Sequence, residues 1–203
     1  MDGVLFDSIP LAKKVFMEGH PGLTEEMYHE IHSGNFHVEA EKYAHLRVKE
    51  TEEERQKRYR EYSETKSKSP LFEGIKDLLF DLHSMGYILV VNTNAYEKNS
   101  MPLLEYSGIK NLFDFIATAE VSKDKVEKFK IIEDKYKTNK EDVLFITDSL
   151  GDVKAADAVR VPTVAVTWGV HDRSFFEREK YSNLVGIVDT MESLKNFIID
   201  QQK

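Results

Sequence analysis

Residues 143–152 read Val-Leu-Phe-Ile-Thr-Asp-Ser-Leu-Gly-Asp, and this stretch decides the fold that we predict for the chain. A short apolar run that ends in polar residues is typical of a buried strand in a parallel sheet. Two carboxylates, Asp148 and Asp152, follow the run directly. Because ligands of open parallel sheets bind beyond the carboxyl ends of the strands, the stretch predicts a strand with site residues directly after it.

Helices and strands alternate on both sides of this stretch. Short apolar runs predict further strands at residues 87–91, 113–116, 163–167 and 185–188. Apolar residues at helical spacing predict helices that include residues 98–107, 153–160 and 191–200. Alternation of this kind predicts an α/β fold with a doubly wound, mostly parallel sheet that helices cover on both faces.

The segment 9–69 follows a different pattern, because its apolar residues recur at helical spacing without an intervening strand. Small, charged and ring-locked residues at 67–70 mark the point where the pattern changes. We therefore predict an α/β core made of residues 1–8 and 70–203, with an all-helical cap at 9–69 inserted near the N-terminus. The basic cluster at residues 55–60 is interpreted as a solvated face of a cap helix.

Composition excludes several classes of function. The chain has 203 residues, of which 41% are hydrophobic, so it is long enough to bury a core. Its net charge of -8 disfavours a general nucleic-acid-binding protein. The absence of cysteine excludes disulfides and a thiol nucleophile. No apolar run approaches the length of about 18 residues that a membrane helix needs, so we expect a cytoplasmic protein without a membrane partner.

Polar residues that follow predicted strands form the candidate site. They are a hydroxyl, an amide, lysines and carboxylates, at Thr93, Asn94, Lys123, Lys125, Asp148 and Asp152, together with Asp2 and Gly3 near the N-terminus. Such a set at one sheet edge suits a phosphate held beside a hard cation. Structural alternatives stay open: a helix-entry turn for the Thr-Asn pair, a solvated face for the lysines and a capping pair for the two later aspartates.

The order of these pieces resembles the haloacid dehalogenase superfamily of aspartate-dependent phosphatases. Asp-Gly-Val-Leu-Phe-Asp-Ser at 2–8, the helical insertion, a strand with Thr-Asn, a lysine, and a strand with Thr-Asp-Ser-Leu-Gly-Asp follow one another as they do in that family. The resemblance spans nearly the whole chain. It is most similar to the branch that includes phosphoglycolate phosphatases and β-phosphoglucomutases with helical caps, and it implies a Rossmann-like core.

The resemblance implies a role for each site residue. Asp2 matches the general acid/base and contributes to metal binding, Thr93 and Asn94 match the residues that hold the phosphoryl group, and Gly3 lies in the same substrate-binding loop. Lys125, with Lys123 as the second choice, matches the lysine that neutralises nucleophile and phosphate charge. Asp148 and Asp152 match the acidic motif that binds Mg²⁺. The implied reaction is Mg²⁺-dependent hydrolysis of a small phosphorylated metabolite through a phosphoaspartate.

One departure from the family pattern concerns the nucleophile. The nucleophilic aspartate of the family would stand one position before Met1, directly after a buried first strand. We hypothesise that the sequence begins at an internal methionine of a longer chain. We therefore expect the first core strand to be largely missing, and the 203-residue form to be fragile, with little or no phosphatase activity.

Other functions were weighed against this one. A phosphomutase of the same superfamily uses the same core residues, and a non-enzymatic binding protein that has given up the nucleophile also fits, so both stay open. A receiver domain lacks a helical insertion of this length, and a dehalogenase does not need Asp2 or the full magnesium site. His171 is left without a role, and the sequence predicts no oligomeric state.

Overall fold

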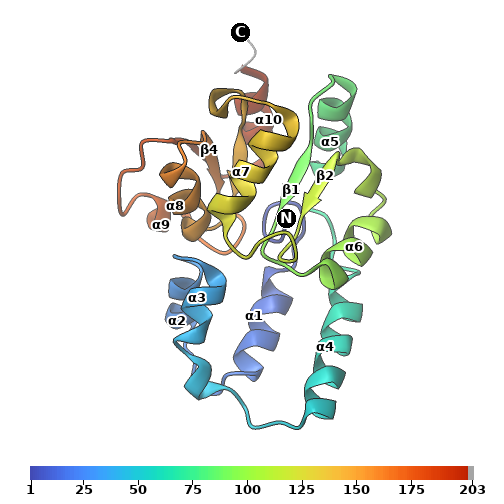
Figure 1. The fold of residues 1–203 in the computed structure, drawn as a ribbon, viewed down its shortest axis with the longest axis vertical. Coiled ribbons are helices and arrows are strands. Elements are labelled where there is room, and N and C mark those ends of the chain that lie inside the picture. The colour runs from blue at the N-terminus through green and yellow to red at the C-terminus, as the bar shows by residue number, and fades with distance from the viewer. Residues whose placement is uncertain (201–203) are drawn as a thin grey trace.

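The computed structural model describes residues 1–200, which form a helical group beside an α/β part (Figure 1). The helical group consists of four helices and one short 3₁₀ turn: α1 (Ile9–Glu18), α2 (Glu25–Ile31), α3 (Phe36–Glu41), η1 (Ala44–Leu46) and α4 (Glu52–Lys66). The chain leaves the α/β part directly before α1 and returns to it after α4. The division into residues 9–69 and the remainder stays a prediction about domains.

The α/β part contains parallel strands in two separate sheets. β1 (Val90–Asn92) pairs with β2 (Phe115–Ala117), and the other sheet has the order β3 (Phe145–Thr147), β4 (Thr163–Val166) and β5 (Leu184–Val188). All these pairings are parallel. Parallel neighbours need crossover connections, which the helices supply. The predicted α/β class with parallel strands is confirmed.

Helices alternate with the strands along the chain. They are α5 (Ile75–Ser84), α6 (Glu97–Tyr106), η2 (Lys110–Leu112), α7 (Lys125–Tyr136), η3 (Lys140–Asp142), α8 (Leu150–Ala158), α9 (Arg173–Phe176) and α10 (Met191–Asp200). None of the helices within residues 1–200 combines the length and the apolar character needed to span a membrane. The helix predicted at 153–160 begins earlier, at Leu150, so Asp152 lies in its first turn.

Three strands, β1, β2 and β3, begin later than their apolar runs predict. β1 begins at Val90 because this residue is the first to pair with β2, and β3 begins at Phe145 because its partner on β4 is Thr163. These strands also end one residue beyond their apolar runs, so the polar residues Asn92 and Thr147 belong to them. The apolar pattern marks the buried segment, whereas the register of the neighbouring strand decides which residues join the ladder.

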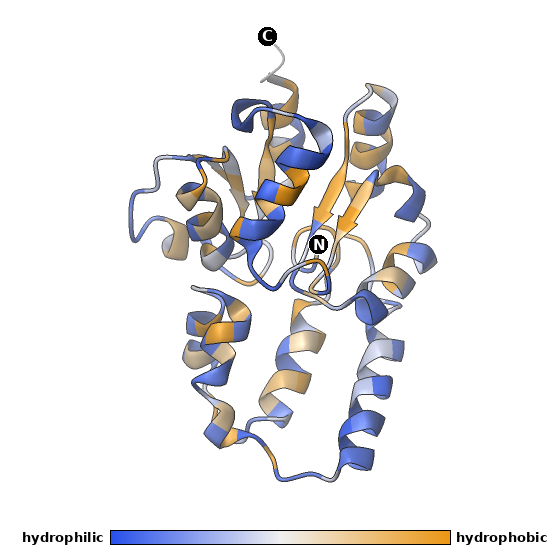
Figure 2. Cartoon of the chain, in the orientation of Figure 1, coloured by the Kyte–Doolittle hydropathy of each residue, from blue (hydrophilic) through white to orange (hydrophobic). Residues whose placement is uncertain are grey.

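A gap separates the two sheets. Within residues 1–200 no strand pairing joins β1 to β3. A cavity of about 630 Å³ lies between them, which we call the sheet cavity. Its lining is mostly apolar and includes Val4, Leu78, Leu82, Val91, Ile146 and Leu194. In Figure 2 the strands on both sides are coloured as hydrophobic. A further strand in this space remains a prediction.

Residues 1–6 fold back on themselves at one end of the sheet cavity. The amide of Leu5 donates to the carbonyl of Met1 over 2.8 Å, and the amide of Gly3 donates to the carbonyl of Phe6 over 3.0 Å. Phe6 is fully buried beside α5 and α6. This tight turn fixes the position of Asp2 at the junction of the α/β part and the helical group.

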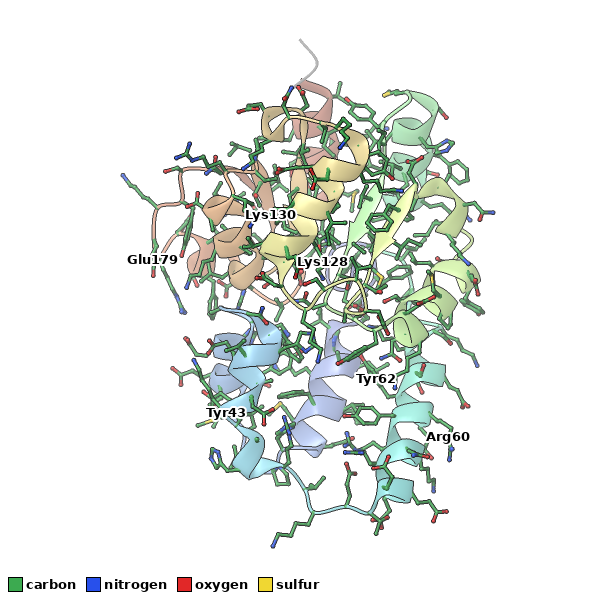
Figure 3. All side chains as sticks on the ribbon, in the orientation of Figure 1. Tyr43, Arg60, Tyr62, Lys128, Lys130 and Glu179 are labelled. Carbon is green, nitrogen blue, oxygen red and sulfur yellow. The ribbon has the colours of Figure 1, made fainter. Side chains whose placement is uncertain are left out.

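The helical group encloses its own small core. Tyr28 and Ile31 of α2 pack with Ala40 of α3 and with Val170, which comes from the loop after β4. Contacts from Val170 therefore join the helical group to the α/β part. Figure 3 shows Tyr62 projecting from α4 toward α1.

The interpretation of residues 55–60 as a solvated face is wrong for Arg58. Its guanidinium forms two hydrogen bonds with the carboxylate of Glu50, at 2.6 and 3.1 Å, and both side chains are largely covered. Arg60 is exposed, as predicted (Figure 3). Glu50 lies before α4 and reaches back to the helix, a contact that the charge pattern along the helix alone does not reveal.

Candidate active site

A cavity of about 760 Å³ lies between the helical group and the carboxyl ends of β1 and β3. We call it the site cavity. Its lining includes seven of the eight predicted site residues: Asp2, Thr93, Asn94, Lys123, Lys125, Asp148 and Asp152. Gly3, the eighth, is not part of the lining and lies against the Asp148 side chain. The structure thus brings the sequence-predicted residues together from positions far apart in the chain.

Asp2 is held by two side chains that contact the same carboxylate oxygen. Its Oδ1 accepts a hydrogen bond from the Ser8 hydroxyl over 2.5 Å and lies 2.8 Å from the Lys66 ammonium. Burial acts to raise the pKa of Asp2, but the Lys66 charge, the N-terminal charge and the hydrogen bonds from Lys66 and Ser8 together outweigh it, so the pKa lies below its usual value. The same pairing raises the pKa of Lys66 against the opposing effect of burial.

Lys66 is a site residue that the sequence analysis did not identify. It is the last residue of α4, and only 4% of its side chain is exposed. Its ammonium also lies 5.8 Å from the centre of the Tyr62 ring, a cation–π distance. The signal available in the sequence was a lysine at the end of the insertion, beside the predicted junction. That signal does not indicate which carboxylate the lysine reaches.

Lys125 is the lysine that lies within the candidate site. Its ammonium lies 2.6 Å from Asp152 Oδ2 and donates to the backbone carbonyl of Asn92 over 3.3 Å. The Thr147 hydroxyl donates to the same Asp152 oxygen over 3.0 Å. Lys123 is exposed, and its ammonium lies 6.0 Å from the centre of the Tyr96 ring. The geometry therefore favours Lys125 over Lys123 as the cation beside the carboxylates.

Lys128 holds the Thr93-Asn94 loop in place through hydrogen bonds. This lysine is fully buried, and its ammonium donates to the Thr93 carbonyl over 2.6 Å and to Asn94 Oδ1 over 3.0 Å. Burial, followed by the nearby Lys125 charge, lowers the pKa of Lys128 to about 7. Lys128 lies on α7 next to the strand ends (Figure 3). The sequence shows only a lysine-rich segment. Which of these lysines are buried and which are exposed depends on how α7 packs against the strands.

Asp148 is buried against glycines. Its Oδ2 accepts a hydrogen bond from the Val170 amide over 2.8 Å, and burial raises its pKa to about 6. A Cβ atom on Gly3 would lie 1.9 Å from that oxygen, and one on Gly169 would lie 2.3 Å from it. Gly3 also has φ +68°, in the left-handed region. Only glycine leaves room for this carboxylate.

The carboxylates at this edge suit a hard cation. Asp148 and Asp152 supply oxygen ligands of the type that Mg²⁺ prefers. Asp148 is buried, and none of the ion pairs formed within residues 1–200 includes it, so a cation would compensate its charge. The described residues contain no cluster of three or more His, Cys, Asp or Glu side chains arranged to hold a metal. Further ligands would come from backbone, water or phosphate oxygens.

His171 connects the helical group to the site. Its Nδ1 accepts from the Leu150 amide over 2.9 Å, and its Nε2 donates to the carbonyl of His29 over 2.9 Å. Burial lowers the pKa of this fully buried imidazole to about 4. Beside it, the amide of Gly151 and the hydroxyl of Ser149 each donate to the carbonyl of His32 over 2.9 Å. The end of α2 is thus docked on the start of α8.

Comparison with known proteins gives consistent relationships. Residues 1–166 match the family model described as haloacid dehalogenase-like hydrolase. A phosphoglycolate phosphatase of Mesorhizobium japonicum is 30% identical over 115 residues, which cover 55% of this chain and 51% of the relative. A phosphoglycolate phosphatase of Aliivibrio fischeri is 28% identical over 189 residues, covering 83% of this chain and 82% of the relative.

Solved structures show the same fold. The crystal structure of a predicted phosphatase from Clostridium acetobutylicum superimposes with a TM-score of 0.78 at 20% identity, covering 98% of this chain and 95% of that one. The chain spans about half the length, or less, of the first curated relatives that it matches. The family model, which matches residues 1–166, leads to one conclusion: this chain belongs to the haloacid dehalogenase-like hydrolase family.

Proposed function

We propose that the site cavity serves a Mg²⁺-dependent hydrolase of phosphate monoesters that works through a phosphoaspartate. The observation that carries this proposal is the convergence of Asp2, Thr93, Lys125, Asp148 and Asp152 on one cavity at the carboxyl ends of β1 and β3. Family membership supports phosphatase-type chemistry. The proposed substrate is a small phosphorylated metabolite of the cytoplasm.

The phosphoryl group is held by groups of this chain. The Thr93 hydroxyl, the Asn94 side chain and the Lys125 ammonium surround the proposed phosphate position and orient its oxygens. Lys128 keeps the Thr93-Asn94 loop in place from behind. Mg²⁺, when bound by Asp148 and Asp152, would neutralise charge on the transferring group.

The proposed acceptor of the phosphoryl group is an aspartate directly before Met1. Its carboxylate oxygen forms the new bond to phosphorus while the bond to the ester oxygen breaks, and Asp2 gives its proton to the leaving oxygen. Asp2 then takes a proton from the water that cleaves the phosphoaspartate and releases phosphate. The 203-residue chain carries no such acceptor, so we expect it to show no phosphatase activity.

The Lys66 contact restricts when Asp2 acts as an acid. While the Lys66 ammonium lies 2.8 Å away, the carboxylate of Asp2 stays ionised, which suits the base step. Donation of a proton requires the pair to separate. Because Lys66 ends α4, we propose that residues 9–69 act as a cap whose movement changes this distance.

Hydrolysis of p-nitrophenyl phosphate with Mg²⁺ tests the proposal. The 203-residue chain is compared with a chain extended at its N-terminus by an apolar strand that ends in aspartate. We expect turnover only in the extended chain, and a loss of about 10²-fold or more in its Lys125→Ala variant, because that side chain supplies the charge beside the phosphate. A folded extended chain without turnover would overturn the proposal.

Product analysis separates the phosphomutase alternative. A phosphomutase passes the phosphoryl group from the aspartate to a second hydroxyl, so the extended chain would isomerise a sugar phosphate faster than it releases inorganic phosphate. Release of phosphate without isomerisation supports the hydrolase. Binding of phosphate and Mg²⁺ without turnover in either chain supports the binding-protein alternative.

A further inference from the structure

We infer that the leaving group bound in the site cavity is a neutral, hydroxyl-rich group such as a sugar, and not a carboxylate-bearing group such as glycolate. The inference rests on the proposed function, since it names the substrate class of the same cavity. It departs from the phosphoglycolate phosphatases that the chain resembles. Three properties of the cavity wall carry it: charge balance, unpaired polar atoms and size.

Charge balance comes first. Five of the six lysine and arginine side chains in the wall of the site cavity are paired with carboxylates of the same wall, Lys123 being the exception. The pairs are Arg47 with Glu41 at 2.7 Å, Arg58 with Glu50 at 2.6 Å, Lys66 with Asp2 at 2.8 Å, Lys125 with Asp152 at 2.6 Å, and Arg55 with Glu52. Apart from Lys125, which the proposed phosphate position uses, a substrate carboxylate entering this wall would compete with a carboxylate already present for each of these cations.

Unpaired polar atoms come second. Buried side-chain atoms without a hydrogen-bond partner among residues 1–200 include His20 Nε2, Asn99 Oδ1 and both polar atoms of the Asn92 side chain, and these residues line the site cavity. His20 Nδ1 donates to the Phe16 carbonyl over 2.8 Å, which leaves Nε2 as an acceptor in the neutral ring.

The type of these atoms selects the ligand. His20 Nε2 and Asn99 Oδ1 are both acceptors, so each needs a donor from a ligand or from water. A hydroxyl group supplies such a donor and can also accept from Asn92 Nδ2, whereas the oxygens of a carboxylate only accept and would find a partner in Asn92 Nδ2 alone. A site that hydrogen-bonds hydroxyl groups discriminates strongly against ligands that lack them.

Size and surface agree with a ring-sized leaving group. The cavity of about 760 Å³ lies in the upper part of the range of about 300–1,000 Å³ that is typical of pockets for larger ligands. Its wall includes the aromatic rings of Phe16, Tyr28, Tyr59 and Tyr62. Aromatic rings offer flat apolar surface for the C–H faces of a sugar, which glycolate is too small to cover.

Lys123 is the residue that would support the alternative, a leaving group that carries a carboxylate. It lines the site cavity, and no carboxylate within residues 1–200 forms an ion pair with it. Its ammonium lies 6.0 Å from the centre of the Tyr96 ring, on the exposed side of the cavity. If the leaving group carried a carboxylate, Lys123 would be its available partner, so variants of Lys123 separate the two readings.

Calorimetric titration of the 203-residue chain in Mg²⁺ tests the inference, because binding is measured without turnover. The ligands are inorganic phosphate, 2-phosphoglycolate and glucose 6-phosphate. We expect glucose 6-phosphate to bind at least about tenfold more tightly than inorganic phosphate. The affinity of 2-phosphoglycolate should be close to that of inorganic phosphate. His20→Phe and Asn99→Ala should weaken the sugar phosphate several-fold, whereas the exposed Asn111→Ala serves as the matched control.

The outcomes are distinguishable. Tighter binding of 2-phosphoglycolate than of glucose 6-phosphate, lost in Lys123→Ala, overturns the inference and leaves the proposed function intact. Failure of the folded chain to bind any of the three ligands overturns the proposed function and the inference with it. In the extended chain, the ratio of kcat/KM for glucose 6-phosphate and 2-phosphoglycolate gives an independent measurement, and a ratio below one contradicts the inference.

Discussion

At the scale of single residues, the ion pair between Lys66 and Asp2 links the end of α4 to the N-terminal turn. Both side chains are largely removed from water, at 4% and 21% exposure. A buried pair contributes little compared with apolar packing, but removal of one partner leaves an uncompensated charge, which typically costs about 3–5 kcal/mol. The pair is therefore a sensitive point for both stability and charge.

We predict that Lys66→Met lowers the free energy of unfolding at neutral pH by about 3 kcal/mol. Asp2 in the wild type has a lowered pKa, so its contribution to stability is present above the unfolded pKa and lost as pH falls. Without Lys66, burial raises the pKa of Asp2, and the contribution instead falls as pH rises. Urea unfolding at several pH values measures this reversal. The double variant Lys66→Met/Asp2→Asn should recover most of the loss, and a variant without such recovery contradicts the pairing.

His171 gives a second prediction at this scale. Its pKa is lowered from 6.5 to about 4, so the folded state holds the neutral ring while the unfolded chain binds a proton below pH 6.5. Stability from this group is complete above pH 6.5 and falls by about 3 kcal/mol as pH drops to 4. His171→Asn removes the titration and should flatten this part of the pH profile of unfolding. An unchanged profile would assign the pH dependence to other groups.

Single residues also show how far sequence reasoning reaches. Thr93 and Lys125 were selected because they follow predicted strands or match a family motif, and the structure places both in the site cavity. Their roles stay predictions. Lys66, Lys128 and His171 escaped because their partners lie far away in the chain and no local pattern encodes the contact. Long-range pairing of a buried polar group depends on tertiary packing, not on spacing.

At the scale of elements, the docking of α2 on α8 depends on the absence of a side chain at Gly151. A Cβ atom there would lie 2.1 Å from the backbone oxygen of Gly34, which a rotation of a side chain does not relieve. The amide of Gly151 donates to the His32 carbonyl at the same contact. Backbone thus meets backbone where the helical group touches the α/β part.

We predict that Gly151→Ala pushes the turn at Gly34 away from α8. The expected loss of stability is about 1–3 kcal/mol, as for other overpacked sites. Hydrogen exchange of the Gly151 region, followed by mass spectrometry, should become faster together with that of residues 32–35. Lys154→Ala, on the exposed side of the same helix, is the control. Unchanged exchange in Gly151→Ala would show that the backbone at this contact adjusts without separating the helical group from α8, and would contradict the prediction.

Elements were predicted better in kind than in extent. The apolar runs at 143–146 and 163–167 correspond to β3 and β4, and the helices follow their apolar spacing. Their ends differ because strand limits depend on the partner, as the pairing of Phe145 with Thr163 shows. Arg58 is covered, and not solvated as predicted, for a related reason, since Glu50 reaches it from outside the helix.

At the scale of the whole molecule, alternation of elements was enough to predict the α/β class, whereas the division into two sheets required the structure. β4 is buried along its whole length and paired on both sides, while β1 and β2 have only each other. We predict that amide hydrogens of β4 exchange most slowly and that those of β1 exchange faster by a measurable margin. Equal protection in both sheets, measured by NMR, would show that they unfold as one unit.

The sheet cavity has a consequence for volume. The sheet cavity of about 630 Å³ is mostly apolar and partly open, and the part that packing keeps from water is lost when the chain unfolds and water surrounds each side chain. Unfolding then reduces the volume of the system, toward the larger end of the usual range of about −20 to −100 mL/mol. High pressure should therefore unfold this protein at moderate values, as tryptophan fluorescence of Trp168 under pressure would report. Val91→Leu, which adds bulk to the cavity wall, should shift the midpoint upward, so hydrostatic pressure gives a direct measure of how empty the centre of this molecule is.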